Sequence, residues 1–391
     1  MTVPLASQDK LKDLLTAYYQ RLGSGQKPVA WCTSVGPAEL LRAFGFAVYF
    51  PENQAALIGA RRLAGEFIPL AIQAGFSADI CSYLTADTGA FLAGQTALSA
   101  YGLNQVPKPQ VLVFNTNQCR EVKEWFLFYG EKFHVPVIGL QTPQNIDDLS
   151  PALLDYLVSA WQGLIARLET ISGTRFDPRR YREVLSLSAE ASRLWQAFLD
   201  SNRQIPARHS FFDHLILMAP AVVLRGTDEA VAFYRQLLAE VEGIPATKNE
   251  ARYRFYWEGM PIWGKMRFLS EFFAGRRISI VASTYCQSWA FDFDPALALP
   301  STARAYAGIF ITRSQAFKKQ YLEDMIKRFS VDAVLFHDAK TCPYNTNSRF
   351  GLPGKLRDIP CLTFYGDLVD LRHFSEQEFT LRLEAFIEQL H

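Results

Sequence analysis

Short apolar runs alternate with amphipathic segments of helical length in the first and last parts of the chain. In the first part, the apolar runs that predict buried strands lie at 28–33, 46–50, 111–114 and 135–140. The amphipathic segments that predict helices between them lie at 8–23, 38–45, 54–75 and 119–133. In the last part, the predicted strands lie at 253–257, 278–283, 333–336 and 361–365, and the predicted helices at 263–273, 314–329 and 376–390. Strands that alternate with helices favour a mostly parallel sheet in each part.

The middle of the chain has a different pattern. From about 150 to 242, apolar residues recur every three to four positions, which predicts helices alone. The whole pattern therefore predicts an α/β protein in which two Rossmann-like lobes with mostly parallel sheets flank a helical section. The two lobes look like variations on one topology. We place the N-terminal lobe at 1–148, the helical section at 149–248 and the C-terminal lobe at 249–391.

Composition narrows the class of protein. The 391 residues include 40 Lys and Arg against 39 Asp and Glu, so the chain lacks the basic excess that attracts nucleic acid. Residues 1–10 lack the apolar core of a signal peptide, and no run of about 18 apolar residues occurs. We therefore expect a cytoplasmic protein that has neither nucleic acid nor a membrane as a partner.

The chain lacks several common nucleotide-binding and catalytic motifs. No Gly-rich turn ends in Gly-Lys-Ser/Thr, and neither Gly-x-Gly-x-x-Gly nor Gly-x-Ser-x-Gly occurs. His-Glu-x-x-His is also absent, and the six His are scattered. The candidate chemistry therefore lies with the cysteines.

Three of the six cysteines share a local pattern. Cys119 and Cys342 each follow an apolar strand and a polar turn, at the end of the strand where ligands collect in α/β sheets. Cys81 lies in a similar polar turn that opens onto a predicted helix. We expect helix N-termini at these turns to favour thiolates. No pair has Cys-x-x-Cys spacing, so spacing alone leaves both a shared metal site and buried free thiols open.

The segments around these cysteines resemble motifs of the benzoyl-CoA reductase and 2-hydroxyacyl-CoA dehydratase family. The resemblance spans roughly residues 34–375, and its most specific part is the Cys81 motif. The segments similar to the three cluster motifs are 75–83 with 86–89, Cys119 with Lys123, Trp125 and Phe126, and 340–342. Those similar to the benzoyl-CoA reductase B-type subunit are 258–263, 367–370 and 374–375.

The resemblance implies an iron-sulfur catalytic subunit of an enzyme of anaerobic aromatic degradation. Cys81, Cys119 and Cys342 would bind a [4Fe-4S] cluster and leave one iron that no cysteine holds. The substrate would be an acyl-CoA thioester such as benzoyl-CoA, which the enzyme would reduce at low potential. A related second catalytic subunit and an ATP-dependent iron-sulfur activator protein would be its partners. Glu258 and Trp263 would bind the substrate, although helix capping and core packing are alternative roles for them.

Departures from the family pattern keep other functions open. Gln118 stands where the second motif commonly has Gly, and Thr341 stands where the third has Ser. Cys286 falls where the reductase-like pattern has no cysteine, which leaves a double-cubane cluster reductase of small molecules as an alternative. A 2-hydroxyacyl-CoA dehydratase subunit is another, since ring reduction and dehydration both use an open iron and a thioester carbonyl. A non-catalytic partner subunit is the third. His337 and Asp338 fit either a proton relay or a hydrogen-bonded turn.

Overall fold

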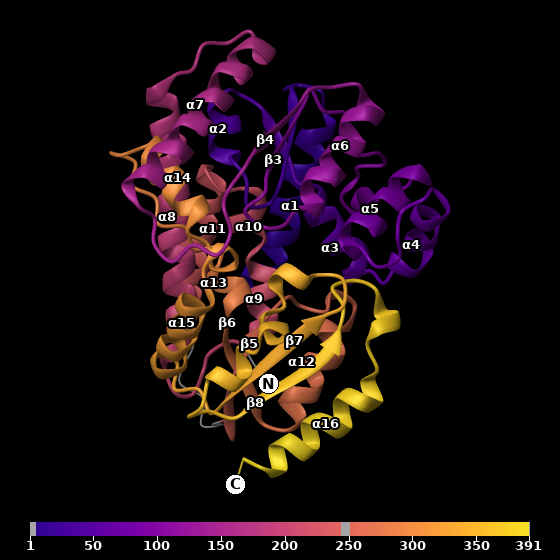
Figure 1. Cartoon of the computed structure of the whole chain (residues 1–391), viewed down its shortest axis with the longest axis vertical. Helices are drawn as coiled ribbons and strands as arrows, with labels where there is room; N and C mark the ends of the chain where they lie inside the picture. The colour runs from indigo at the N-terminus through magenta and orange to yellow at the C-terminus, as the bar shows by residue number, and fades with distance from the viewer. Residues whose placement is uncertain (1–4, 244–250, 391) are drawn as a thin grey trace.

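The computed structural model describes residues 5–243 and 251–390, which form two α/β lobes joined by a helical section (Figure 1). No helix in these two ranges has the length and apolar character that a membrane crossing requires. Each lobe is built on one parallel sheet of four strands. The fold is therefore mixed α/β with two parallel sheets, as predicted from the pattern of apolar runs.

The N-terminal sheet has the strand order β2-β1-β3-β4. Its strands are β1 (Val29–Cys32), β2 (Ala47–Tyr49), β3 (Val111–Asn115) and β4 (Val137–Leu140). The helices of this lobe are α1 (Ser7–Gly23), α2 (Ala38–Ala43), α3 (Pro51–Ala60), α4 (Ala64–Gln73), α5 (Ser82–Leu92) and α6 (Glu121–Phe133). Strands β1 and β3 are buried at every position, as expected where a parallel sheet is covered on both faces.

The C-terminal sheet has the strand order β6-β5-β7-β8, which is the same arrangement as in the first lobe. Its strands are β5 (Tyr253–Glu258), β6 (Ile278–Ser283), β7 (Ala333–Ala339) and β8 (Cys361–Gly366). The helices of this lobe are α12 (Met266–Gly275), α13 (Thr284–Gln287), α14 (Leu299–Ala307), α15 (Gln315–Arg328) and α16 (Glu376–Glu388). Strand β7 therefore stands in the second sheet where β3 stands in the first.

The helical section connects the two lobes. Its helices are α7 (Pro151–Ser172), α8 (Pro178–Asp200), α9 (Phe211–Leu217), α10 (Ala219–Val223) and α11 (Asp228–Glu242). Helix α8 packs against α2 of the N-terminal lobe and against α11, while α7 packs against α14. Figure 1 shows these helices beside both sheets.

A buried ion pair holds this junction. The guanidinium of Arg225 lies 3.2 Å from the carboxylate of Glu39 in α2, and the hydroxyl of Tyr306 in α14 donates to the same carboxylate at 2.6 Å. Ser188 of α8 donates to it at 2.7 Å. Removing one partner of a buried pair leaves the other charge without compensation, at a cost of about 3–5 kcal/mol, so substitution of Arg225 or Glu39 would destabilise this junction.

Three predicted elements differ from the structure. The single helix predicted at 54–75 is two helices, α3 and α4, because Arg62 between them adopts a left-handed φ of 61°. Strand β7 pairs with β8 as far as Ala339, so His337 and Asp338 lie within a strand and not in a turn. Cys342 is followed by a three-residue 3₁₀ turn and not by an α-helix.

Helix α3 reaches the C-terminal lobe through Gly59. A Cβ atom at this position would stand 2.2 Å from Cγ1 of Val369 and 3.2 Å from Cβ of Trp263. Glycine therefore allows the two lobes to approach closely here. The contact sets the distance between α3 and Trp263, which face the same cavity.

Candidate functional site

The structure brings the turns of Cys81, Cys119 and Cys342 together between the lobes. Cys81 is the residue before α5, Cys119 lies between β3 and α6, and Cys342 follows β7. All three residues are partly buried. Negative charge on Cys342 raises the pKa of Cys81, and charge on Cys81 and Cys342 raises the pKa of Cys119. The three sulfur atoms therefore lie close enough to interact electrostatically.

Burial has a larger effect on these thiols than any nearby charge. It raises the pKa of all three above the usual value of a cysteine, that of Cys342 to about 12. Desolvation of the charged form outweighs the field of nearby N–H groups in these thiols. Those N–H groups act in the opposite direction and lower each pKa, with Tyr83 and Leu84 acting on Cys81, Val122 on Cys119 and Asn345 on Cys342.

Asp367 links the turns of Cys81 and Cys342. Its fully buried carboxylate accepts hydrogen bonds from the hydroxyl of Ser82 and, at 2.7 and 2.8 Å, from the hydroxyl and N–H of Thr341. The N–H of Ser82 also donates directly to the Thr341 hydroxyl at 3.0 Å. Because Ser82 belongs to the N-terminal lobe and Thr341 to the C-terminal lobe, these bonds fix one cysteine turn against the other.

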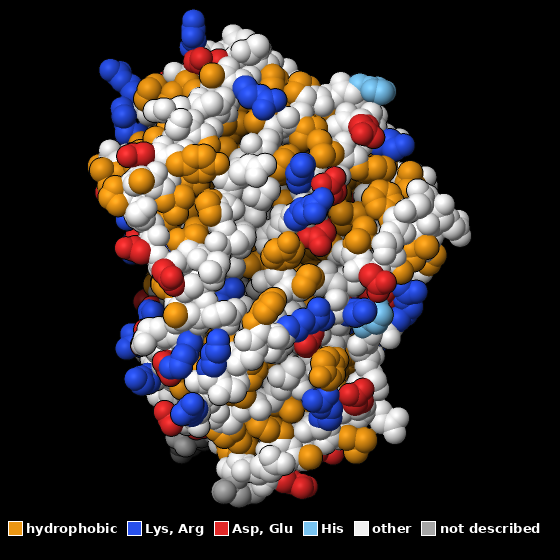
Figure 2. Space-filling view, viewed as in Figure 1, with side chains coloured by type: hydrophobic (Ala, Val, Ile, Leu, Met, Phe, Trp, Pro, Cys, Tyr) orange, Lys and Arg blue, Asp and Glu red, His pale blue; other side chains and the backbone are white. Residues whose placement is uncertain are grey.

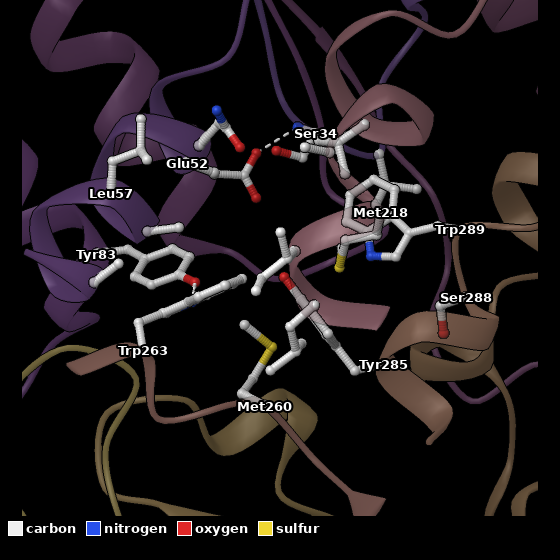
Figure 3. A pocket seen from close by; sticks show the side chains of 18 of the residues that line it. Ser34, Glu52, Leu57, Tyr83, Met218, Met260, Trp263, Tyr285, Ser288 and Trp289 are labelled. Carbon is white, nitrogen blue, oxygen red and sulfur yellow. Dashed lines mark hydrogen bonds between the residues drawn. The ribbon is translucent and has the colours of Figure 1, made fainter. Parts of the chain in front are cut away.

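A cavity of about 450 Å³ lies beside the cysteine turns (Figure 3). Its wall includes one residue from the neighbourhood of each cysteine. Tyr83 lies two positions after Cys81, Gln118 directly precedes Cys119, and Asn345 lies three positions after Cys342. The cavity therefore borders all three turns.

Glu52 supplies the buried carboxyl group of this cavity. It lies in the first turn of α3, where it accepts a hydrogen bond from the N–H of Ser34 and another, 2.8 Å long, from Nε2 of Gln118. Burial raises the pKa of Glu52, and the hydrogen bonds from Ser34 and Gln118 partly offset that rise. Sequence reasoning missed Glu52, because an acidic residue in a first helical turn is common for reasons of helix stability alone.

Aromatic side chains form the wall on another side of the cavity. Nε1 of Trp263 donates a hydrogen bond to the hydroxyl of Tyr83, and the ring centroids of Trp263 and Tyr285 lie 6.3 Å apart in an edge-on arrangement. Figure 3 shows Glu52 across the cavity from Met260 and Tyr285. The site therefore combines one carboxyl group with a largely apolar enclosure.

Of the two residues predicted to bind substrate, Trp263 lines the cavity and Glu258 does not. Glu258 is fully buried at the end of β5, where Oε1 accepts a hydrogen bond of 2.8 Å from Nδ2 of Asn347. Lys318 donates to Oδ1 of the same asparagine at 2.9 Å. Burial raises the pKa of Glu258 to about 7, and Oε2 has no hydrogen-bond partner among the described residues.

The remaining candidates lie away from the cavity wall. Nδ1 of His337 contacts the carbonyl oxygen of Met260 at 2.6 Å, and burial lowers the pKa of this imidazole to about 4. Asp338 forms an ion pair of 2.7 Å with Arg349. Cys286 is fully buried in α13 and does not line the cavity. In residues 5–243 and 251–390, no three His, Cys, Asp or Glu side chains converge closely enough to hold a single metal ion.

Comparison with known proteins identifies the family. A family model described as 2-hydroxyglutaryl-CoA dehydratase, D-component, matches residues 33–390. The chain belongs to this family. The match covers both lobes and all three cysteine turns, so the resemblance read from the cysteine motifs is confirmed.

The chain is similar to subunits of both dehydratases and reductases. It is 28% identical over 395 residues to the (R)-2-hydroxyisocaproyl-CoA dehydratase alpha subunit of Clostridioides difficile, covering 97% of this chain and 94% of the relative. It is also 28% identical over 415 residues to the B subunit of benzoyl-CoA reductase from Thauera aromatica, with 98% and 94% covered. The alpha subunit of lactoyl-CoA dehydratase from Anaerotignum propionicum is 25% identical over 384 residues, with 93% and 90% covered. Relatives of both branches therefore match nearly the whole chain.

Proposed function

We propose that this chain is an iron-sulfur catalytic subunit of a radical acyl-CoA enzyme, with Cys81, Cys119 and Cys342 as ligands of a [4Fe-4S] cluster. The observation that carries the proposal is that a residue beside each cysteine lines one cavity, which also contains a buried carboxyl group. The names of the relatives support an acyl-CoA thioester as substrate.

The donor set suits a cluster better than a single ion. Three thiols converge from two lobes, and N–H groups near each sulfur are of the kind that stabilise an electron-rich cluster. A cluster of several irons is larger than one ion, so the thiolates that hold it stand farther apart than the ligands of a single ion. When bound, it would supply single electrons and one iron open to an oxygen atom of the substrate.

Glu52 would hold or accept a proton inside the cavity. Burial raises its pKa, so it can carry a proton at a higher pH than an exposed glutamate, while Ser34 and Gln118 fix its orientation. The wall formed by Tyr83, Trp263 and Tyr285 would exclude water from a reactive intermediate.

Dehydration of a 2-hydroxyacyl-CoA is the reaction that the site supports best. This reaction removes a hydroxyl group and a proton from neighbouring carbons, and Glu52 would accept that proton. The description of the matching family supports the same reaction. Reduction of an aromatic acyl-CoA such as benzoyl-CoA is the second candidate, favoured by the aromatic wall and by the reductase relative.

The proposed enzyme needs two partners. The relatives are named as alpha or B subunits, which supports a second, related catalytic subunit in a heterodimer. An ATP-dependent iron-sulfur activator would deliver the electrons.

Anaerobic purification with the second catalytic subunit tests the proposal. This chain should contain about four irons, and Cys119→Ala should lose the cluster while the matched control Cys361→Ala keeps it. With activator and ATP, a 2-hydroxyacyl-CoA should lose water, whereas reduction of benzoyl-CoA would support the second reaction. About eight irons per chain would support a double-cubane cluster instead. A full cluster without turnover of any acyl-CoA would support a non-catalytic role.

A further inference from the structure

The cavity has very few charged side chains. Among the described residues, its wall includes two, Glu52 and Lys12. Glu52 is buried beside the cysteine turns, whereas Lys12 on α1 is exposed, as are the wall residues Ala60 and Ile216. No cation therefore stands in the buried part of the wall within the described ranges.

The inner wall is instead apolar and adaptable. Aliphatic, thioether and aromatic side chains from both lobes and from the helical section meet there. They include Leu15, Leu57, Met218, Met260, Trp263 and Tyr285. Methionine side chains fill irregular spaces and adjust to ligands of different shape, so this wall suits an apolar group.

Buried cations elsewhere in the described structure are already engaged. Arg225 pairs with Glu39 and donates to the carbonyl oxygens of Val222 and Gly36 at 2.8 and 3.0 Å. Lys318 donates to Asn347. Neither cation is part of the cavity wall as described, so neither is available to a charged group inside it.

We propose that the acyl group bound in this cavity is uncharged and apolar, and that a dicarboxylic acyl group is rejected. The inference rests on the proposed function. A second carboxylate on the acyl chain would lose its hydration without gaining a cation, and it would share the enclosure with Glu52. An unpaired buried charge costs far more than the same volume of apolar contact.

Three CoA thioesters of similar length test the inference on the complete anaerobic enzyme complex. 4-Methylpentanoyl-CoA ends in two methyl groups, glutaryl-CoA ends in a carboxylate, and the methyl ester of glutaryl-CoA removes that charge while keeping the chain. We expect calorimetry to give a Kd for 4-methylpentanoyl-CoA at least about 100-fold lower than for glutaryl-CoA. The methyl ester should recover most of this difference.

The outcomes separate this inference from the function on which it rests. Equal or tighter binding of glutaryl-CoA would overturn the specificity and leave the acyl-CoA function standing. Binding of none of the three thioesters would overturn both. Weak binding of the methyl ester would assign the rejection to shape and would also overturn the role of charge.

A cation placed in the wall gives an independent test. Met218 is buried on the wall, and Figure 3 shows its side chain at the cavity. Met218→Lys should bind glutaryl-CoA about 10-fold more tightly than the native protein does. Met218→Gln, which is neutral and of similar length, should not. A folded Met218→Lys protein, with native circular dichroism, that binds glutaryl-CoA no better would contradict the inference. If Met218→Lys does not fold, the Kd values of the three thioesters for the native protein test the inference.

Discussion

In the N-terminal lobe, β3 leads through Cys119 to the α-helix α6 of 13 residues, whereas in the C-terminal lobe the equivalent strand β7 leads through Cys342 to a 3₁₀ turn of three residues. The two cysteines nevertheless meet at one site. Both thiols have raised pKa values, and both have a backbone N–H nearby that lowers the pKa. The shared placement follows from the equivalent positions of β3 and β7 in the two sheets. Figure 2 shows the face of the molecule on which both lobes are seen, with charged side chains of both signs interspersed over it.

The lobes differ more in their buried carboxyl groups. Glu52 of the N-terminal lobe faces the cavity. Glu258, at the end of β5, bonds to Asn347 and lies outside the cavity wall. In the proposed enzyme, the N-terminal lobe would therefore supply the proton chemistry, while the C-terminal lobe contributes Cys342 and the wall residues Trp263 and Tyr285.

The largest expected effect comes from removing a cysteine of either lobe. Cys119→Ala and Cys342→Ala should each lower activity by at least about 1,000-fold, because the cofactor carries the difficult chemistry. Iron content should fall in both, whereas Cys361→Ala should keep its iron. If Cys342→Ala retained a normal cluster and activity, the two lobes would not share the site.

The second prediction separates the two carboxyl groups. Glu52→Gln should reduce the rate constant of a single turnover by about 100- to 10,000-fold, because a positioned acid or base contributes this much. Glu258→Gln should change it by less than about 10-fold, since Glu258 does not line the cavity. Iron content should be normal in both variants. A larger effect at Glu258 would reverse the assignment of roles to the lobes.

The sequence predicts the sheets and the cysteine turns better than it predicts the other residues that line the cavity. Buried strands and strand-end cysteines leave a local pattern, and the sheets and the three cysteine turns follow from it. The break between α3 and α4 leaves no such pattern in the sequence, because Arg61, Arg62 and Leu63 are all good helix formers. There, Nη1 of Arg61 donates to the carbonyl oxygen of Ala97 and Nε of Arg62 to that of Gly264, both at 3.0 Å, so tertiary contacts replace the local preference.

The contents of the cavity depend on residues far apart in the chain. Glu52 becomes a candidate only when Ser34 and Gln118 approach it, and neither spacing nor composition indicates that approach. Glu258 is the opposite example. Its position at the end of a strand predicts that it contacts a ligand. Asn347, 89 positions later, occupies that side of its carboxyl group instead.

The third prediction concerns stability and pH. The pKa of Glu258 is raised by burial to about 7, against about 4.3 for an unfolded glutamate. The protonated form therefore favours the fold, and the stability that it contributes is complete below pH 4.3 or so and is lost as the pH rises through about 7. The whole loss amounts to about 4 kcal/mol for such a shift. In urea unfolding of the native protein, the free energy of unfolding should be lower at pH 8 than at pH 5 by most of this amount. The difference between the two pH values should be much smaller in Glu258→Gln. Equal pH dependence in both proteins would contradict the prediction.

The smallest expected effect is at the bond between the lobes. Asp367 accepts hydrogen bonds from Ser82 and Thr341, so Asp367→Asn presents an N–H₂ group to at least one of these donors. The free energy of unfolding should fall by about 1–3 kcal/mol, because buried donors lose their acceptor. The cluster should also be lost faster in air, since the turns of Cys81 and Cys342 are no longer fixed against each other. Iron release followed by absorbance measures this rate.

Asp370→Asn is the matched control for this bond. Asp370 lies three positions after Asp367 and pairs with Arg372 at 2.6 Å. Its side chain has no hydrogen bond to a cysteine turn within the described ranges, so its loss should leave iron release unchanged. If Asp367 stabilised only its own loop, both variants would have a lower free energy of unfolding, and neither would release iron faster. Faster release in Asp367→Asn alone would show that one carboxylate sets the position of the two lobes at the cluster.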